Sequence, residues 1–119
     1  AHEEERGIVA RHIYGSLFFA VVGKIENLLQ DRQTPKVLIL EMHQTISIDT
    51  TALECLQELE KDLRLRGGVL MFAGLNKQAQ SLFERSGFKN QLEPNQTQPD
   101  FHSAMVEAMR LTSTQENPT

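Results

Sequence analysis

The chain has 119 residues, of which 39% are hydrophobic and 24% are charged, and its formal net charge is −4. This length and composition predict one globular domain that buries roughly two-thirds of the surface of its unfolded chain. The acidic balance gives no basic face for nucleic acid, and the longest apolar run, residues 17–22, is too short to insert into a bilayer as a spanning helix.

The first third of the chain predicts two short strands and a helix. Residues 7–14 are rich in β-branched and aromatic types and predict a strand. Gly15-Ser16 predicts a turn, after which residues 17–19 predict a second strand that pairs with the first. Apolar residues at helical spacing between Val21 and Leu29 predict a helix that has ended by Pro35.

A central strand and a strongly patterned helix follow. The run Val37–Leu40 is apolar without alternation, as in a strand that is buried on both faces. Four residues then form one apolar stripe at helical spacing: Ala52, Leu56, Leu59 and Leu63. Glu60 and Arg64 form an i,i+4 pair, and Gly67-Gly68 predicts the end of this helix.

The next strand and helix repeat this order. Val69–Ala73 predicts a buried strand, and Asn76 is placed to cap a helix that ends at Gly87. Residues 93–99 contain two prolines and several amides, which predict a loop. The resulting element order, β-β-α-β-α-β-α-α once the last helix is added, favours right-handed crossovers and a mostly parallel sheet.

The last helix is predicted to begin after Asp100 and to bury Phe101, Ala104, Met105 and Ala108. We therefore expect a single domain over residues 1–119, with a core at about 7–111 and a disordered tail at 112–119. The acidic start directly before a strand pattern suggests a domain cut from a longer protein.

The sequence contains no motif of a known enzyme class. It has no Gly-rich phosphate loop, no His-Glu-x-x-His, no Cys-x-x-Cys and no Gly-x-Ser-x-Gly. The four histidines lack metal-ligand spacing, and His12 and His43 are interpreted as polar residues at strand ends. The single cysteine, Cys55, excludes an internal disulfide and is interpreted as a small packing residue in a reducing compartment. These absences predict a protein that is not an enzyme and has no metal and no cofactor.

Hydroxyl groups and a carboxylate gather at residues 47–51, where a predicted strand meets a predicted helix. Thr51 and Glu54 have the spacing of a capping box, in which each side chain accepts from the other residue's backbone N–H. That interpretation leaves Asp49 and Thr50 without a role. A phosphate on Thr50 would lie near the positive end of the helix, so a regulatory site remains the alternative.

Three segments together resemble the STAS domain, a family named after sulfate transporters and anti-sigma factor antagonists, over about residues 7–111. Residues 13–20, Ile-Tyr-Gly-Ser-Leu-Phe-Phe-Ala, resemble the strand-turn-strand of its SulP transporter branch. Residues 48–53, Ile-Asp-Thr-Thr-Ala-Leu, are similar to the Asp-Ser-Ser-Gly-Leu loop of the family. Residues 83–88, Phe-Glu-Arg-Ser-Gly-Phe, resemble the helix end before the last strand.

The resemblance implies an α/β fold: a small sheet of mixed, mostly parallel strands with helices packed mainly on one face. It implies that Thr50 is the position of phosphorylation, because the hydroxyl directly after the Asp is the one modified in the antagonist branch. Here Thr-Thr-Ala replaces Ser-Ser-Gly, which removes a permissive glycine. The expected partner surface consists of Ser47, Asp49, Thr50 and Thr51.

Two functions follow from the resemblance. In the first, the chain is the regulatory domain of a SulP-type sulfate or bicarbonate transporter. It is then a soluble domain on the cytoplasmic side of the cell (inner) membrane that contacts its own membrane domain or a cytosolic regulatory protein. In the second, it is a free-standing anti-sigma factor antagonist-like protein that is controlled by phosphorylation. Nucleotide binding is a weaker third alternative, because the chain has no phosphate-binding motif beyond the helix start.

Overall fold

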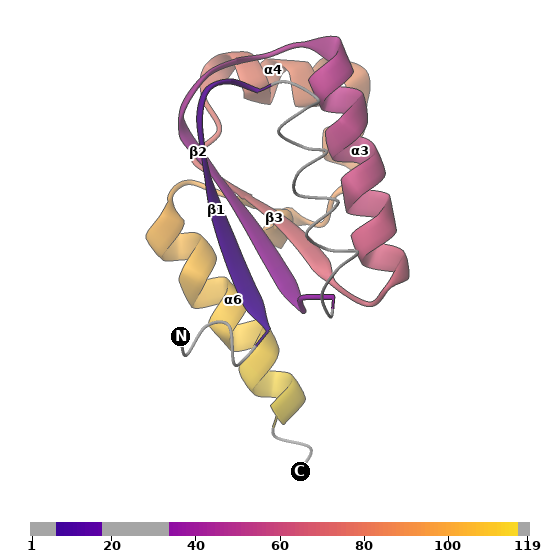
Figure 1. The fold of residues 1–119 in the computed structure, drawn as a ribbon, viewed down its shortest axis with the longest axis vertical. Coiled ribbons are helices and arrows are strands. Elements are labelled where there is room, and N and C mark those ends of the chain that lie inside the picture. The colour runs from indigo at the N-terminus through magenta and orange to yellow at the C-terminus, as the bar shows by residue number, and fades with distance from the viewer. Residues whose placement is uncertain (1–6, 18–33, 117–119) are drawn as a thin grey trace.

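The structure, a computed structural model, describes residues 7–17 and 34–116 (Figure 1). Its strands are β1 (Ile8–Leu17), β2 (Val37–Ile48), β3 (Val69–Ala73) and β4 (Thr97–Gln98). Its helices are α3 (Thr50–Leu65), α4 (Lys77–Ser86), α5 (Phe88–Gln91) and α6 (Phe101–Glu116), and a 3-10 turn spans Pro94–Gln96. The helix predicted between Val21 and Leu29, and residues 18–19 of the predicted second strand, lie outside the described residues.

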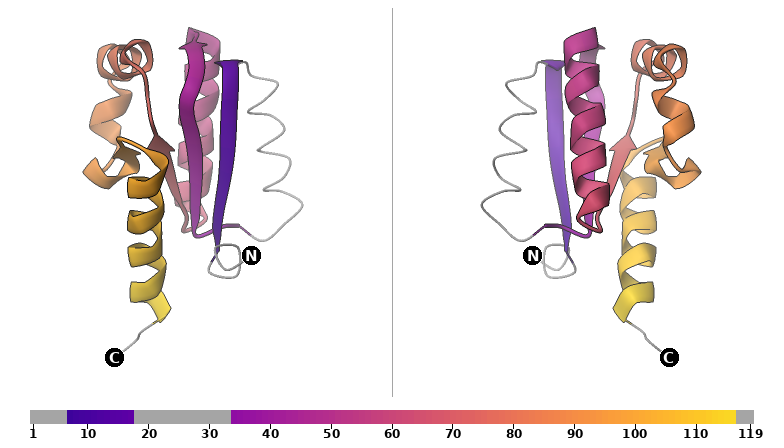
Figure 2. Two further views of the ribbon diagram at one scale, coloured as in Figure 1. Left: turned by 90° about the vertical axis from the view of Figure 1, so that its left-hand side faces the viewer. Right: turned by 90° about the vertical axis from the view of Figure 1, so that its right-hand side faces the viewer.

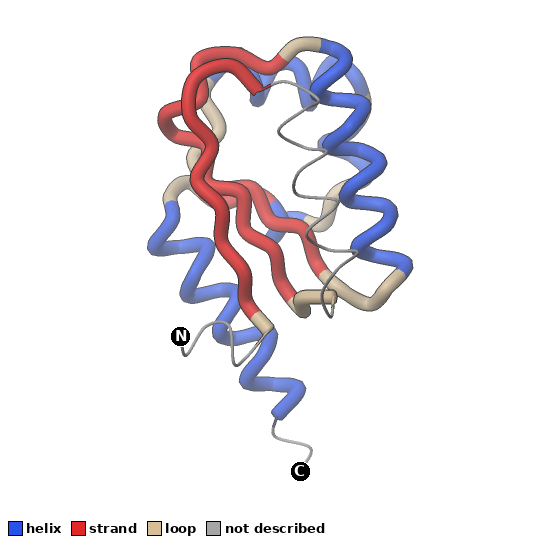
Figure 3. Tube along the Cα trace, in the orientation of Figure 1, coloured by secondary structure: helices blue, strands red, loops and turns tan. Residues whose placement is uncertain are grey.

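The described strands form one sheet in the order β1-β2-β3-β4, and each of the three neighbouring pairs is parallel. Parallel neighbours require crossover connections, as the alternation of strands and helices in the sequence predicted. β3 is much shorter than β2, and of β2 it pairs with residues 37–41 alone. Consequently β1 and β2 continue together past the end of β3, toward the end of the molecule where α4 lies (Figure 3).

The turn predicted at Gly15-Ser16 is wrong. β1 runs through both residues, and Gly15 pairs with Thr45 while Ser16 pairs with Ser47. Gly15 has φ 69°, and the pairing register shifts between Gly15 and Ser16. A glycine at positive φ beside a register shift is typical of a β-bulge, so this glycine bends a strand where the sequence suggested a reversal of the chain.

Apolar side chains on the two faces of the sheet form two separate cores. On one face Leu38, Leu40 and Phe72 pack with residues of α3, α4 and α5. On the other face Ile39 and Met71 pack with Ala104 and Ala108 of α6. The expectation that helices pack mainly on one face is confirmed for α3, α4 and α5, and α6 covers the opposite face (Figures 1 and 2).

Helix α3 buries the predicted apolar stripe: Ala52, Leu56, Leu59 and Leu63. Its C-terminus is closed by backbone N–H groups of Gly67, which donates to Arg64 O at 3.0 Å, and of Gly68, which donates to Leu63 O at 2.8 Å. Gly67 has φ 88°, so these two bonds form the glycine-dependent helix end that the sequence predicted. The predicted ion pair of Glu60 with Arg64 is present at 3.4 Å.

The C-terminal quarter departs from the prediction in two places. The segment 93–99, predicted as a loop, contains β4, whose residues Thr97 and Gln98 pair with Phe72 and Ala73. The buried side chain of Gln96 fixes this edge strand, because its Nε2 donates to Leu70 O at 2.9 Å. Such a short edge strand carries no alternating pattern that a sequence could display.

The tail predicted to be disordered from Thr112 is helical as far as Glu116, and residues 117–119 lie outside the described residues. Thr112 is fully buried, and its Oγ1 donates to Ala108 O at 3.1 Å. It continues the i,i+4 series of Ala104 and Ala108 that faces the sheet. Its hydroxyl can be buried because the preceding helical turn accepts its hydrogen bond.

Candidate functional site

The predicted partner surface lies where β2 ends and α3 begins. Ser47 is half-buried near the end of β2, opposite Ser16 of β1. Asp49, Thr50 and Thr51 are all exposed, and they occupy the junction and the first two positions of α3. The structure therefore brings the four predicted residues together on one accessible corner.

Asp49 caps α3, and the predicted capping box of Thr51 and Glu54 is wrong. Asp49 has extended backbone, with φ −90° and ψ 174°, and its Oδ1 accepts from the backbone N–H of Ala52 at 2.7 Å. The helix already begins at Thr50, so Thr51 has helical backbone and cannot serve as the N-cap. Asp49 thus gains a structural role, and the hydroxyls of Thr50 and Thr51 are the ones presented at the positive end of the helix.

Side chains of α4 hold the end of β2 in place, a feature that the sequence analysis missed in part. Asn76 caps α4 as predicted, accepting from Ala79 N–H at 2.8 Å, and its Nδ2 also donates to Thr45 O at 2.8 Å. Gln78 accepts from Ile48 N–H and donates to Ile48 O, both at 2.9 Å. These amides replace the strand partner that β2 lacks after β3 has ended, and they fix the backbone directly before Asp49.

Two large apolar side chains lie exposed on the same two-stranded extension. Ile46 is 73% exposed on β2, and Tyr14 is 66% exposed on β1. Neither was predicted, because isoleucine and tyrosine in a strand pattern are ordinarily assigned to the core. Ile46 directly precedes Ser47, and Tyr14 pairs with Gln44 further along the same extension. Two singly exposed apolar side chains are ordinary on a protein surface, so they do not by themselves mark an interface.

His12 and His43, predicted to lie at strand ends, lie inside β1 and β2, where they flank a buried carboxylate. Glu41 accepts at its Oε2 from the backbone N–H of His43 at 3.1 Å, and its Oε1 lies 2.7 Å from His43 Nδ1 and 3.4 Å from His12 Nδ1. Burial alone would raise the pKa of Glu41, but the hydrogen bonds from His43 and His12 lower it below the ordinary value. Among the described residues, no group of three His, Cys, Asp or Glu side chains is arranged to hold a metal ion.

Comparison with known proteins identifies the family and the fold. Residues 1–104 match the model of the STAS domain family. Over 89 residues the chain is 30% identical to YvdB of Bacillus subtilis (strain 168), which is provisionally named a sulfate transporter. The aligned part is 73% of this chain but only 17% of that protein, so the chain spans about a sixth of its relative.

Solved structures show the same fold. A crystal structure of a sulfate transporter family protein from Wolinella succinogenes is 28% identical, with a TM-score of 0.81 and coverage of 91% of this chain and 88% of that one. The STAS domain of a SulP transporter from Vibrio cholerae is 22% identical, with a TM-score of 0.79, covering 94% and 87%. In the structure of SLC26A9 the similar region is 21% of that chain, 17% identical over 92% of this one, with a TM-score of 0.68.

No helix in the described part of the chain has the length and apolar composition needed to cross a membrane. The family match covers most of the sequence, the fold agrees with solved STAS domains, and the segment 48–53 occupies the strand-to-helix junction. The chain belongs to the STAS domain family.

Proposed function

We propose that this chain is the cytoplasmic regulatory domain of a SulP-type transporter of sulfate or bicarbonate and has no catalytic activity of its own. It acts by contact with its own membrane domain or with a cytosolic regulatory protein. The contact surface is the corner of Ser47, Asp49, Thr50 and Thr51. Similarity to transporter STAS domains supports the transporter over the free-standing antagonist-like alternative.

One observation carries this proposal: the corner is exposed yet built on a fixed backbone. Asp49 closes the first turn of α3, and Gln78 holds both backbone groups of Ile48. A surface fixed before its partner arrives loses little conformational entropy on binding, which favours recognition. Thr50 and Thr51 extend from this fixed backbone into solvent.

Phosphorylation of Thr50 is the regulation that we propose for this surface. Thr50 is the first residue of α3, where the helix dipole favours negative charge, and it directly follows the Asp49 carboxylate. A phosphate there would add about two negative charges to one that is already present, and so would change the field over the whole corner. Contact with an acidic partner would weaken, and contact with a basic partner would strengthen.

The test uses the full-length transporter in membranes, with anion uptake as the readout. Thr50→Glu is expected to change uptake, whereas Thr50→Val, which keeps the shape and adds no charge, is expected to change it less. Ser113→Glu adds the same charge on α6, away from the corner, and serves as the matched control. Equal uptake by the wild type and Thr50→Glu would refute the docking switch.

Phosphorylation itself is tested by mass spectrometry after incubation of the domain with ATP and a lysate of its source cells. We expect one added phosphate on the peptide containing Thr50, and none on Thr50→Val. No added phosphate, or phosphate only on another residue, would remove the modification from the proposal but leave the docking surface. We also expect no saturable binding of GTP or ATP by the unmodified domain.

The gene context distinguishes the transporter from the free-standing alternative. A reading frame that continues upstream of this domain with several apolar segments of about 20 residues each would identify a membrane transporter. A reading frame that holds only this domain would favour the antagonist-like function.

A further inference from the structure

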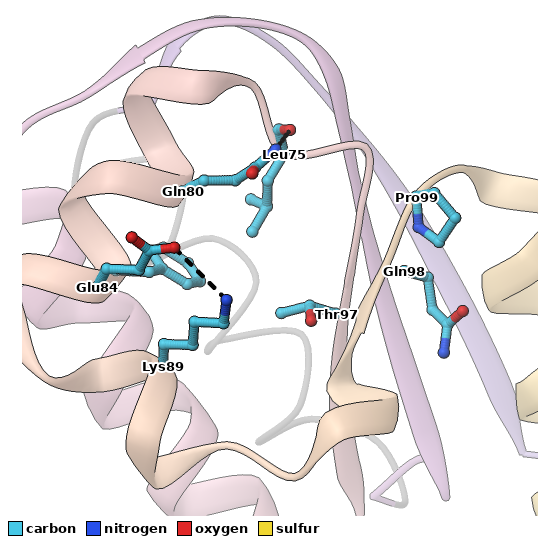
Figure 4. Close-up of a pocket in the computed structure, with 8 residues that line it drawn as sticks. Leu75, Gln80, Glu84, Lys89, Thr97, Gln98 and Pro99 are labelled. Atoms are coloured by element: carbon cyan, nitrogen blue, oxygen red, sulfur yellow. Dashed lines mark hydrogen bonds and ion pairs between the residues drawn. The ribbon is translucent and has the colours of Figure 1, made fainter.

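A cavity of about 320 Å³, which shares no lining residue with the proposed partner surface, lies where β3 and β4 end (Figure 4). Ligands of parallel α/β sheets bind in such places, outside the carboxyl ends of the strands. Helix α4 and the start of α5 form one wall, and β4 with Pro99 forms the other. The volume is at the lower end of the range for small-molecule sites, so the ligand is small.

The floor of the cavity is apolar and rigid. Phe83 is buried there, and its ring lies 5.1 Å from that of Phe72 and 4.9 Å from that of Phe88, measured between centroids. Leu75 and Pro99 continue this apolar lining on either side. Because Phe83 is held by two other rings, the floor exists before any ligand enters, and it suits an apolar side chain or ring.

The charged groups of the cavity are one cation and one anion. Lys89 Nζ lies 3.5 Å from Glu84 Oε1, and both side chains are 59% exposed, so this ion pair is weak and exchangeable. A ligand that carries only a carboxylate would compete with Glu84 for Lys89. A ligand that carries only an amine would compete with Lys89 for Glu84. A ligand that carries both charges can pair with each of them and leaves neither unpaired.

The neutral polar groups fit the same ligand. The side-chain NH₂ group of Gln80 already donates to Leu75 O at 2.8 Å, and that of Gln98 to Asn95 O at 2.9 Å. Their amide oxygens remain as acceptors, each NH₂ group keeps a second N–H, and the Thr97 hydroxyl can donate. Gln80 thus supplies an acceptor for an ammonium and Thr97 a donor for a carboxylate at the cavity, while the amide of Gln98 points away from Glu84 and Lys89 (Figure 4).

We propose that this cavity binds a free α-amino acid with an apolar side chain. The carboxylate pairs with Lys89, the ammonium pairs with Glu84, and the side chain packs against Leu75 and Pro99, over the buried ring of Phe83. This site is separate from the docking corner, and its occupancy would stiffen the edge formed by α4, α5 and β4.

The experiment titrates the 119-residue chain, labelled with ¹⁵N, with L-phenylalanine and three relatives of it. We expect saturable shifts of the Leu75, Gln80 and Thr97 amide resonances. N-acetyl-L-phenylalanine lacks the ammonium and L-phenylalaninamide lacks the carboxylate, and each should bind about tenfold or more weakly. Glycine, which lacks the apolar side chain, should give no saturable shift.

Two variants and one control sharpen the result. Lys89→Met should weaken phenylalanine binding about tenfold or more, while Lys61→Met, on α3 outside the cavity, should leave it unchanged. Glu84→Gln should weaken phenylalanine but strengthen N-acetyl-L-phenylalanine, because the competing carboxylate is gone. The proposal would be overturned by the absence of saturable shifts with phenylalanine or by shifts at other residues only. Equal affinities for phenylalanine and its two blocked derivatives, or equal losses in the two lysine variants, would also overturn it.

Discussion

The replacement Asp49→Ala tests which residue caps α3. It removes the 2.7 Å hydrogen bond from Ala52 N–H and a negative charge at the positive end of the helix. Loss of such a cap costs about 1 kcal/mol, which lowers Tm by about 4 °C in a domain of this size. Asp49→Asn retains the cap and loses only the charge, so we expect a cost of about 0.3 kcal/mol.

The matched variant is Thr51→Ala, which would be the costly change if the capping box existed. Thr51 is exposed in the first turn of α3, so its loss should change the free energy of unfolding by no more than about 0.5 kcal/mol. Urea unfolding followed by far-UV circular dichroism measures all three variants. If Asp49→Ala unfolds at the wild-type midpoint while Thr51→Ala is destabilised, the assignment of the cap is wrong.

Three further predictions concern the core and its acid stability. Leu56→Ala should lower the free energy of unfolding by about 2–5 kcal/mol, because Leu56 is fully buried. Leu65→Ala, at a side chain that is 70% exposed, should change it by no more than about 0.5 kcal/mol. Equal losses of stability in urea unfolding would contradict the placement of Leu56 in the core. Gly74→Ala should cost at least about 1 kcal/mol, since φ is +73° and a Cβ would lie 2.9 Å from the His43 Cβ; a wild-type unfolding midpoint would exclude that contact. Hydrogen bonds from the Arg110 guanidinium and then from the Asn95 amide lower the pKa of Glu107 from 4.5 to about 2. The stability that ionised Glu107 contributes to the fold is therefore complete above pH 4.5 and is lost as the pH falls toward 2. In Glu107→Gln the free energy of unfolding should therefore fall less between pH 4.5 and pH 2 than it does in the wild type. An unchanged fall would count against the interaction of Glu107 with Arg110 and Asn95.

The elements with strong periodicity were predicted well. The stripe of α3 and the caps Asn76 and Asp100 follow from local patterns, because a helix needs one buried side and a partner for its first N–H groups. The buried run Val37–Leu40 was recognised as a central strand, although β2 continues to Ile48. The prediction stopped early because the residues after Glu41 pair with β1 alone and have mixed burial.

Features that depend on distant contacts were not predictable. β4 exists because Thr97 and Gln98 meet the edge of β3. The hydrogen bonds of Gln78 to Ile48 join residues 30 positions apart, and nothing in either local sequence indicates them. The partners of the buried Glu41 likewise include a histidine from another strand.

By itself the sequence determined the family, the strongly patterned elements α3, β3, α4 and α6, and the corner at residues 47–51, because each of these depends on residues close together in the chain. Only the tertiary structure decided how that corner is built. It made Asp49 the cap, placed α4 against the end of β2, and set α6 on the opposite face of the sheet. The physical reason is that the first N–H groups of a helix, the unpaired backbone of a strand and the apolar face of a sheet are each satisfied by whichever group the fold brings near. Which group that is depends on tertiary contacts, and these cannot be read from the local sequence.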